Sequence, residues 1–254
     1  MKDNPGVKTS KFEIPWHWRA WRARARWAGT RQRIEQWLLS LDPGQVSSSV
    51  SDAWPQGLIL LGGSAGWMMP QRWLQQFTRI DAYDIDPFAP LLFQWRHGRA
   101  LQRQGVIVQH HRSDALLQLP TLLQQHPNAF VWFDNVLGQH RYRIRDEERV
   151  ERELSALKNT LHGRSWGSLH DWLSGPVDVD KAPSQLAGLV QTNIAAQRID
   201  AAFTQSLLQS VGAHTAWSDH LTQVVLPADT PTQLMPWAFR ENYWHWLQAG
   251  WVRG

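Results

Sequence analysis

A glycine-rich turn after a short apolar run is the feature that most restricts the fold of this chain. Residues 58–66 read Leu-Ile-Leu-Leu-Gly-Gly-Ser-Ala-Gly, and residues 80–87 read Ile-Asp-Ala-Tyr-Asp-Ile-Asp-Pro. The first run predicts a buried strand that enters a helix through a turn that a ligand approaches closely. A second strand then ends on Asp84, about 20 residues later, where nucleotide-binding α/β folds place a ribose acceptor. Together the two segments predict an α/β fold and a ligand that contains a nucleoside.

The turn can be compared with three known motifs. A dinucleotide fingerprint needs small residues at its first, third and sixth positions, which here are Gly62, Ser64 and Trp67, so a nicotinamide or flavin turn is not expected. No Gly-Lys-Ser/Thr follows, which excludes a P-loop. Residues 62–66 do match the Gly-x-Ser-x-Gly nucleophile elbow of α/β-hydrolases. That elbow normally follows several strands, whereas the segment before Leu58 is mainly helical in pattern, so a serine hydrolase using Ser64 is kept as the alternative function.

Strand-like and helical patterns alternate through the rest of the chain. The strand-like runs lie at 58–62, 80–84, 106–109, 129–133 and 165–170, and the helical stretches at 67–77, 88–104, 115–125, 146–161 and 184–210. This alternation predicts the α/β class, with a doubly wound, mostly parallel sheet and helices on both faces. Near the C-terminus we expect an antiparallel hairpin of residues 213–217 and 221–226, followed by a Trp-rich helix over 239–251.

Positive charge is concentrated in the first 35 residues, which carry nine Lys or Arg against three acidic residues, in a chain of net charge +4. From residue 16 to residue 41, apolar residues recur at helical spacing: Trp16, Ala20, Ala23, Trp27, Ile34, Leu38 and Leu41. We therefore expect a basic helical extension over residues 1–50, docked on a main domain of residues 51–254 with its basic face in solvent. Two alternatives stay open, a clamp for an anionic substrate or RNA and contact with a membrane surface.

Composition excludes several classes of site. The chain has no Cys, so it forms neither disulfides nor thiolate metal sites, and its eleven His show no recognisable ligand spacing, so no metal is expected. No apolar run reaches the roughly 18 residues of a membrane-spanning helix. The polar start does not resemble a secretory signal, and we expect a cytoplasmic protein.

The order of these signals resembles that of the class I, Rossmann-like, S-adenosylmethionine-dependent methyltransferases over about residues 55–175. Residues 62–66 resemble the family's glycine loop, although Ser64 replaces its second glycine. Segments 83–87, 113–115 and 133–138 resemble those that close the second, third and fourth strands. The resemblance implies a Rossmann-like fold and S-adenosylmethionine as cofactor, bound by Gly62, Gly63, Ser64, Gly66, Asp84, Ile85, Asp114, Ala115 and Asp134.

Individual roles follow from the same resemblance. It implies that Asp84 binds the ribose hydroxyls and that Asp114 contacts the adenine amino group. Asp114 could also cap the helix that starts at Ala115. The segment around Asp134 would lie beside the methyl group and the substrate, and Asp134 could instead simply end its strand.

Methyl transfer requires that donor and acceptor be aligned and that water be excluded, with a base where the acceptor is a hydroxyl or an acidic amine. His170, expected at the end of the fifth strand and followed by Asp171, is the candidate base because imidazole titrates near neutral pH. Asn135 could orient an amine acceptor. The sequence thus predicts methyl transfer to an O or N acceptor, a small molecule or RNA, with a non-catalytic cofactor- or RNA-binding scaffold as a further alternative.

Overall fold

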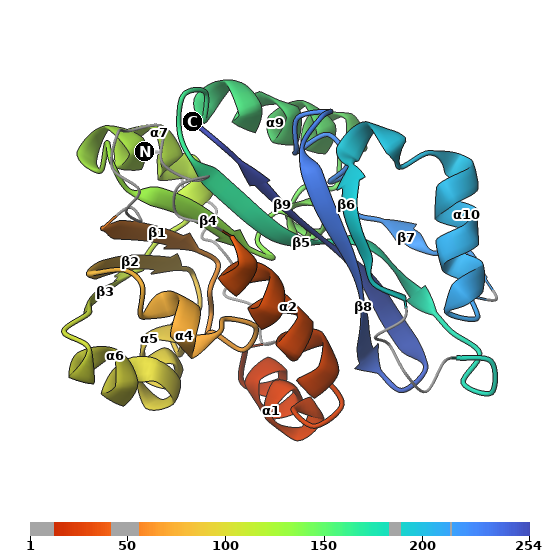
Figure 1. The fold of residues 1–254 in the computed structure, drawn as a ribbon, viewed down its shortest axis with the longest axis horizontal. Coiled ribbons are helices and arrows are strands. Elements are labelled where there is room, and N and C mark those ends of the chain that lie inside the picture. The colour runs from red at the N-terminus through yellow and green to blue at the C-terminus, as the bar shows by residue number, and fades with distance from the viewer. Residues whose placement is uncertain (1–12, 42–55, 183–188, 214) are drawn as a thin grey trace, which may run out of the picture.

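The computed structural model describes residues 13–41, 56–182, 189–213 and 215–254, with side chains from residue 16 onward. In this part of the chain, nine strands form one mixed sheet in the order β3-β2-β1-β4-β5-β9-β8-β6, and β7 pairs with β5 (Figure 1). The strands are β1 (Gly57–Leu61), β2 (Arg79–Asp84), β3 (Ile107–Arg112), β4 (Phe130–Asp134), β5 (Trp166–Pro176), β6 (Gln191–Ala195), β7 (Ser218–Asp219), β8 (Pro231–Arg240) and β9 (Tyr243–Val252).

The first five strands run parallel, as the sequence predicted. Helices cover both faces of this parallel half of the sheet (Figure 1). A strand in it is therefore buried on both sides, which explains why the side chains of β1 are apolar throughout. Leu58 and Leu60 pack into one core cluster with Trp73, whereas Ile59 and Leu61 pack into the cluster on the other face with Leu119. The fold class predicted from the sequence, a doubly wound and mostly parallel sheet, is therefore confirmed.

The helices that connect these strands follow the expected pattern with one shortening. They are α4 (Gln71–Leu74), α5 (Ala89–Phe93), η1 (Gln94–Gly98), α6 (Arg99–Arg103), α7 (Ala115–Gln125), α8 (His140–Arg143) and α9 (Glu147–Thr160). The stretch expected at 67–77 is helical only from Gln71, because Pro70 lies extended at its start and the preceding residues belong to the glycine turn. Helix η1 is a π-helical turn that joins α5 to α6 without a break.

The C-terminal third differs from the sequence prediction. The antiparallel hairpin expected near the C-terminus is present, but it is formed by β8 and β9. Its placement at 213–217 and 221–226 is wrong, because the described residues of these two segments do not pair with each other, and the two-residue β7 between them pairs with β5. The expected helix over 239–251 is also wrong, since these residues form the turn and second strand of the β8–β9 hairpin. Trp244 and Trp246 face one cluster while Leu247 and Ala249 face another, so the segment is buried on both sides as an inner strand. The stretch expected as one helix at 184–210 contains β6, η3 (Ala196–Arg198) and α10 (Ala201–Ser210).

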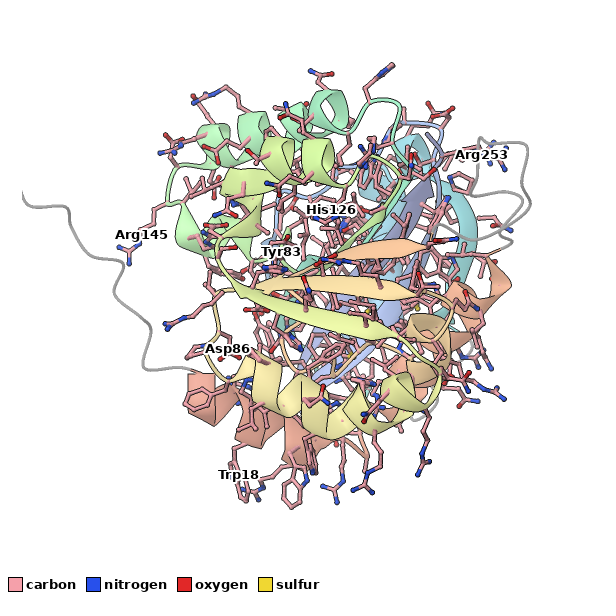
Figure 2. The ribbon with its side chains drawn as sticks, turned by 90° about the vertical axis from the view of Figure 1, so that its left-hand side faces the viewer. Trp18, Tyr83, Asp86, His126, Arg145 and Arg253 are labelled. Carbon is pink, nitrogen blue, oxygen red and sulfur yellow. The ribbon has the colours of Figure 1, made fainter. Side chains whose placement is uncertain are left out.

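The N-terminal extension forms two helices, α1 (Glu13–Ala23) and α2 (Ala28–Ser40). Its apolar face is buried in the cluster that contains Trp73, through Ala20, Trp27 and Ile34. Arg22 and Arg26 on the other face are exposed, and Figure 2 shows the neighbouring Trp18 pointing away from the body of the protein. The described part of the extension therefore packs on the sheet domain with these arginines in solvent, while the expected boundary at residues 50 and 51 lies outside the described residues. None of the helices described is both long and apolar enough to span a bilayer.

Candidate cofactor site

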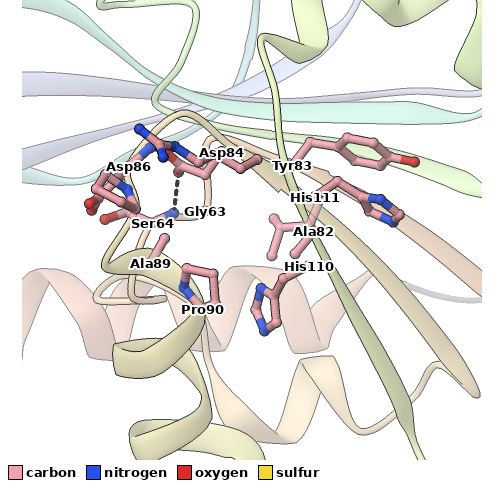
Figure 3. Close-up of a pocket in the computed structure, with 13 residues that line it drawn as sticks. Gly63, Ser64, Ala82, Tyr83, Asp84, Asp86, Ala89, Pro90, His110 and His111 are labelled. Carbon is pink, nitrogen blue, oxygen red and sulfur yellow. Dashed lines mark hydrogen bonds between the residues drawn. The ribbon is translucent and has the colours of Figure 1, made fainter. Parts of the chain in front are cut away.

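A cleft of about 350 Å³ lies at the carboxyl ends of β1, β2 and β3, the edge where open α/β sheets bind ligands. It brings together most of the residues that the sequence assigned to a cofactor. Its lining comprises Trp16, Arg19, Gly62, Ser64, Tyr83, Asp84, Ile85, Asp86, Ser113, Asp114, Ala115, Val136, Gln139 and Arg143. Gly63 lines an adjoining pocket, which Figure 3 shows beside Asp84.

The glycine turn after β1 needs glycine at two positions. Gly62 has φ +73°, and a Cβ there would lie 2.7 Å from the Cβ of Val136. Gly66 has φ +65°, and a Cβ there would lie 2.7 Å from Nε2 of His97, a residue of the π-helical turn η1. Both positions combine a left-handed backbone with a close neighbour, so any side chain would open the turn. The turn is therefore packed against β4 on one side and η1 on the other.

Asp84 fastens the glycine turn to the end of β2. Its Oδ2 accepts a hydrogen bond from the Ser64 backbone N–H at 2.7 Å (Figure 3), and its Oδ1 accepts one from the Asp86 backbone N–H at 2.9 Å. Burial raises the pKa of Asp84, and the backbone donors oppose this only in part. A carboxylate has about four lone-pair sites, so each oxygen can accept one further hydrogen bond from a vicinal diol in the cleft.

Asp86, two residues further on, connects the cleft to helix α1. Its carboxylate accepts a hydrogen bond from Nε2 of His17 at 2.5 Å, while the indole N–H of Trp67 donates to Nδ1 of His17 at 3.1 Å. Because an indole can only donate, Nδ1 of His17 is the unprotonated nitrogen and Nε2 carries the proton. Burial raises the pKa of Asp86, but the hydrogen bonds from His17 and from the Phe88 backbone outweigh it and leave the pKa below its usual value. His17 lies 69 positions from its partner and was not among the site residues predicted from the sequence.

The side of the cleft next to β3 carries Ile85, Asp114 and Ala115. Ile85 is 51 % exposed, which is unusual for so apolar a side chain and leaves its surface free to pack against a ring. Asp114 occupies the N-cap position of α7 but its side chain makes no capping hydrogen bond, so the capping role is wrong. It forms an ion pair with Arg143 of α8 instead, which joins the two walls of the cleft.

Asp134, the last residue of β4, lies beneath this cleft and is not part of its lining. It is 7 % exposed, and burial, followed by the negative charges of Asp84 and Asp171, raises its pKa to about 8. The carboxyl group is therefore mostly protonated at pH 7, unlike an ordinary aspartate at the end of a strand.

The structure does not support His170 as the base. Strand β5 continues to Pro176, so His170 lies inside the sheet and is fully buried. Its Nε2 donates to Oε1 of Gln248 at 3.1 Å, and its Nδ1 accepts from the Ser168 hydroxyl at 2.8 Å. Burial lowers its pKa to about 4. Both nitrogens are used, and the prediction that this residue ends the strand is wrong because β9 pairs along the whole of β5.

Asn135 lies at the tip of β4, as predicted, with a left-handed φ of +56° that asparagine tolerates better than most residues. It is tied to the next strand rather than free: its Nδ2 donates to Oδ2 of Asp171 at 2.9 Å, and its Oδ1 accepts from the Asp171 backbone N–H at 2.9 Å. Asp171 in turn accepts a hydrogen bond from Nδ1 of His245 at 2.8 Å. This buried group beside the cleft was not found from the sequence, because its members lie on separate strands.

The hydrolase alternative can be tested on the same geometry. Nucleophilic catalysis by serine needs a base within hydrogen-bonding reach of its hydroxyl. Among the described residues, no imidazole hydrogen-bonds the Ser64 hydroxyl, which is buried in the turn. The backbone of Ser64 serves instead to hold the glycine turn against Asp84.

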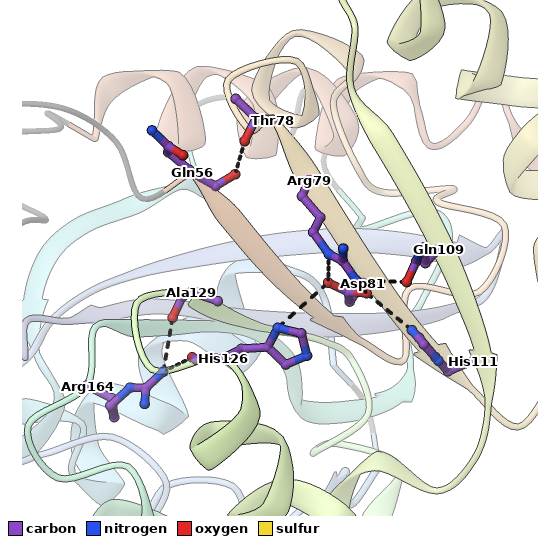
Figure 4. A network of polar contacts seen from close by, with 9 residues as sticks. All are labelled: Gln56, Thr78, Arg79, Asp81, Gln109, His111, His126, Ala129 and Arg164. Atoms are coloured by element: carbon purple, nitrogen blue, oxygen red, sulfur yellow. Dashed lines mark hydrogen bonds and ion pairs between the residues drawn. The ribbon is translucent and has the colours of Figure 1, made fainter.

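Another buried carboxylate, Asp81 in the middle of β2, shows how a purely structural acid is satisfied here. It pairs with Arg79 at 2.7 Å and with His111 at 3.2 Å, and His126 lies at 4.0 Å (Figure 4). Burial raises the pKa of Asp81, but the hydrogen bonds from Arg79 and His111 and the nearby positive charges outweigh it and lower the pKa. Among the described residues, Asp84 accepts hydrogen bonds from backbone donors and forms no ion pair with a cation.

No protein-family model matches the sequence, and no curated protein matches it. Solved structures with a similar chain path include magnesium protoporphyrin IX methyltransferase from Synechocystis PCC 6803 with bound S-adenosylhomocysteine, at 14 % identity and a TM-score of 0.48, covering 96 % of each chain. An S-adenosylmethionine-dependent methyltransferase from Anabaena variabilis aligns over 99 % of each chain, at 11 % identity and a TM-score of 0.45. The strand order β3-β2-β1-β4-β5 is itself that of a Rossmann-like sheet. At such low identity, the argument for function depends on the site itself.

Proposed function

We propose that the protein is an S-adenosylmethionine-dependent methyltransferase that binds the adenosine of its cofactor across the tips of β1, β2 and β3. The observation that carries the proposal is Asp84, whose carboxylate faces a nucleoside-sized cleft with acceptor capacity left after it has fastened the glycine turn. Gly62 lines the cleft with a left-handed backbone, where a ligand can approach the chain closely, whereas Gly66 packs against His97 and is not part of the lining.

The remaining lining residues fit the same ligand. Ile85 offers an exposed apolar surface to one face of an adenine ring, and Asp114 lies next to it as a hydrogen-bond acceptor for an exocyclic amine. The backbone turn at Gly62 and Ser64 lies on the side of the methionine portion, close to Val136 and Gln139. When bound, the cofactor supplies an electrophilic methyl group on a sulfonium ion.

The residues of this chain would align the acceptor and exclude water. Trp16 and Arg19 of α1 form one wall of the cleft, so the N-terminal extension takes part in the site. An indole and a guanidinium beside a cofactor suit a planar or anionic small molecule. We propose an O or N acceptor of this kind. RNA bound through the exposed arginines of α1 is the second acceptor class, favoured by the charge of that helix.

Binding of S-adenosylmethionine to the full-length protein tests the proposal. Saturable binding by calorimetry is expected, with NAD failing to compete and Asp84→Ala reducing the affinity at least about tenfold through loss of a charge-assisted hydrogen bond. Asp180→Ala removes an exposed carboxylate that does not line the cleft and serves as the matched control. Equal affinity in wild type and Asp84→Ala contradicts the ribose assignment. Transfer of a labelled methyl group to a panel of phenols, carboxylates, amines and RNA then separates an enzyme from a cofactor-binding scaffold.

Hydrolysis is tested separately. A phosphonyl probe that labels wild type but not Ser64→Ala would favour the serine hydrolase. We expect no labelling, because a serine without a base in reach stays a weak nucleophile.

A further inference from the structure

Two histidines and one aspartate form a buried cluster next to the cleft, outside the residues used above for the cofactor. Asp171 lies on β5, His220 follows β7, and His245 lies on β9. Each side chain has one ligand atom within 4.8 Å of those of the other two. Their exposures are 4 %, 1 % and 9 %, so the three donors converge in the interior. Such a convergence is not explained by the binding of adenosine.

The hydrogen bonds of His220 fix which nitrogen can bind a ligand. Its Nδ1 lies 2.7 Å from the carbonyl oxygen of Gly138, and because a carbonyl only accepts, Nδ1 carries the proton. Its Nε2 is therefore the unprotonated nitrogen and accepts a hydrogen bond from the Ser174 hydroxyl at 2.9 Å, which a bound metal ion would displace. A backbone carbonyl that holds one imidazole N–H while the other nitrogen faces a ligand is the usual arrangement of metal-binding histidines.

His245 is incompletely satisfied. Its Nδ1 donates to Oδ1 of Asp171, but its buried Nε2 has no hydrogen-bond partner among the described residues. A buried nitrogen left without a partner costs about 1–3 kcal/mol. The residue is 9 % exposed. Because the two ring nitrogens point in divergent directions, an ion shared with Asp171 would take the place of the proton on Nδ1, which already faces that carboxylate.

The carboxylate of the cluster is held in place from outside. Oδ2 of Asp171 accepts from Nδ2 of Asn135, and the Asp171 backbone carbonyl accepts from the hydroxyl of Thr222 at 3.1 Å. The loop after β4 can pack this closely on Asp171 because residue 138 is glycine. A Cβ on Gly138 would lie 2.8 Å from the backbone nitrogen of Asp171. Outer residues that orient the ligands are a regular part of metal sites.

We propose that Asp171, His220 and His245 bind one divalent transition-metal ion, with Zn²⁺ the best match. Two imidazoles and one carboxylate form a zinc ligand set, and three protein ligands leave one position of a tetrahedral site open. The ligand set excludes Mg²⁺ and Ca²⁺ as preferred ions, because these prefer sites built from oxygen ligands. No metal was predicted from the sequence, because the three ligands are 49 and 25 positions apart along the chain (171 to 220, and 220 to 245).

The site lies next to the proposed cofactor cleft. Gly138, which orients His220, belongs to the loop after β4 that also supplies Val136 and Gln139 to the cleft wall. An open fourth position there suits an oxygen of the acceptor, and this one step rests on the proposed methyltransferase function. Metal binding itself does not rest on that function. It is therefore measured without cofactor, so that either proposal can fail while the other stands.

Metal content decides the first part. Untagged full-length protein is stripped with a chelator, incubated with Zn²⁺, freed of unbound ion by gel filtration and assayed by mass spectrometry. We expect about one zinc per chain, as for a three-ligand site. His220→Ala and His245→Ala should each retain at least about tenfold less, and His162→Ala, which removes an exposed histidine, should retain the wild-type amount.

Cobalt spectroscopy decides which residues bind the metal. The natural chain contains no Cys, so a thiolate-to-cobalt charge-transfer band can arise only from an introduced one. His220→Cys loaded with Co²⁺ should show this band, and His162→Cys should not. Wild type with Co²⁺ should give the visible spectrum of a four- or five-coordinate ion rather than that of the hydrated ion.

Several results would overturn the proposal. One is a wild-type zinc content below about one-tenth per chain at saturation, far from the single equivalent of a specific site. Another is full zinc retention by a folded His220→Ala, His245→Ala double variant. If His220→Cys does not fold, as judged by circular dichroism, the wild-type zinc content and cobalt spectrum still decide the question. A cluster that binds no metal would leave His245 and Asp171 as a metal-free imidazole–carboxylate pair.

Discussion

His17 on α1 donates a hydrogen bond at 2.5 Å to Asp86, which follows β2, and so connects the N-terminal extension to the rim of the cofactor cleft. The contact is buried, with side-chain exposures of 8 % and 11 %. Trp67, just after the glycine turn, completes the connection by donating to the other imidazole nitrogen. Helix α1 is therefore fixed over the turn by a chain of oriented polar contacts rather than by apolar packing alone.

Replacing His17 should weaken cofactor binding although the side chain does not line the cleft. His17→Ala removes the partners of both Asp86 and Trp67, and a hydrogen bond to a charged group contributes about 1.5–3 kcal/mol. We expect affinity for S-adenosylmethionine to fall about tenfold or more, because Trp16 and Arg19 on the same helix lose their position. Calorimetry on this variant and on His162→Ala, an exposed control, measures the difference. Unchanged affinity would mean that α1 does not contribute to the site.

How much could be foreseen from the sequence depended on the distance between partners. The glycine turn and Asp84 were identified because they lie on consecutive strands, so one short stretch of sequence contains both. His17 and Asp86 were not paired, since nothing in a local pattern links residues 69 positions apart. His245 was missed for the same reason, while His170, which neighbours Asp171 in sequence, was chosen in its place.

The C-terminal hairpin was missed for a different physical reason. Its tryptophans lie on both faces of β9, with Trp244 and Trp246 in one cluster and Trp251 packed against another. A strand buried on both faces loses the alternation of apolar and polar residues that normally identifies it. Tryptophan on both faces thus resembles an apolar helix, and only the pairing of β9 with β5 and β8 shows otherwise.

Gly62→Ala should abolish cofactor binding at a measurable cost in stability. A left-handed backbone costs a non-glycine residue about 1–2 kcal/mol, and the new Cβ would meet Val136 at 2.7 Å. Gly105→Ala is the matched control, because Gly105 has the same φ of +73° with nothing within 4 Å of the added Cβ. Urea unfolding should show similar backbone strain in both variants, while calorimetry should show lost binding in Gly62→Ala alone. Loss in both would indicate a general effect on the fold.

Asp81 should stabilise the protein at neutral pH and lose that contribution in acid. Its pKa is lowered in the folded state, so its carboxylate contributes stability above the unfolded pKa of about 3.8 that disappears as pH falls through the lower folded value. Asp81→Asn should be less stable at pH 7 by on the order of 1–2 kcal/mol, since Arg79 and His111 are partly exposed and can return to solvent. Denaturant unfolding from pH 7 to pH 3 should show this difference shrinking. A difference that stays constant with pH would assign the effect to packing.

Asp134 should couple cofactor charge to proton release. Its pKa is raised to about 8 by burial and by the charges of Asp84 and Asp171, so it is largely protonated at pH 7. A cation near the tip of β4 favours the ionised form and lowers this pKa. S-adenosylmethionine, which carries a sulfonium, should therefore bind with release of a proton, whereas S-adenosylhomocysteine, a neutral thioether, should bind with less.

Calorimetry at pH 7 in two buffers of different ionisation enthalpy measures the number of protons released. The two ligands share their amino, carboxylate and nucleoside groups, so the difference between them isolates the effect of the sulfonium. Asp134→Asn should remove that difference without changing the shape of the site. Equal proton release by both ligands in wild type would contradict the assignment of Asp134, and a difference that persists in Asp134→Asn would transfer the coupling to Asp84, whose pKa burial also raises.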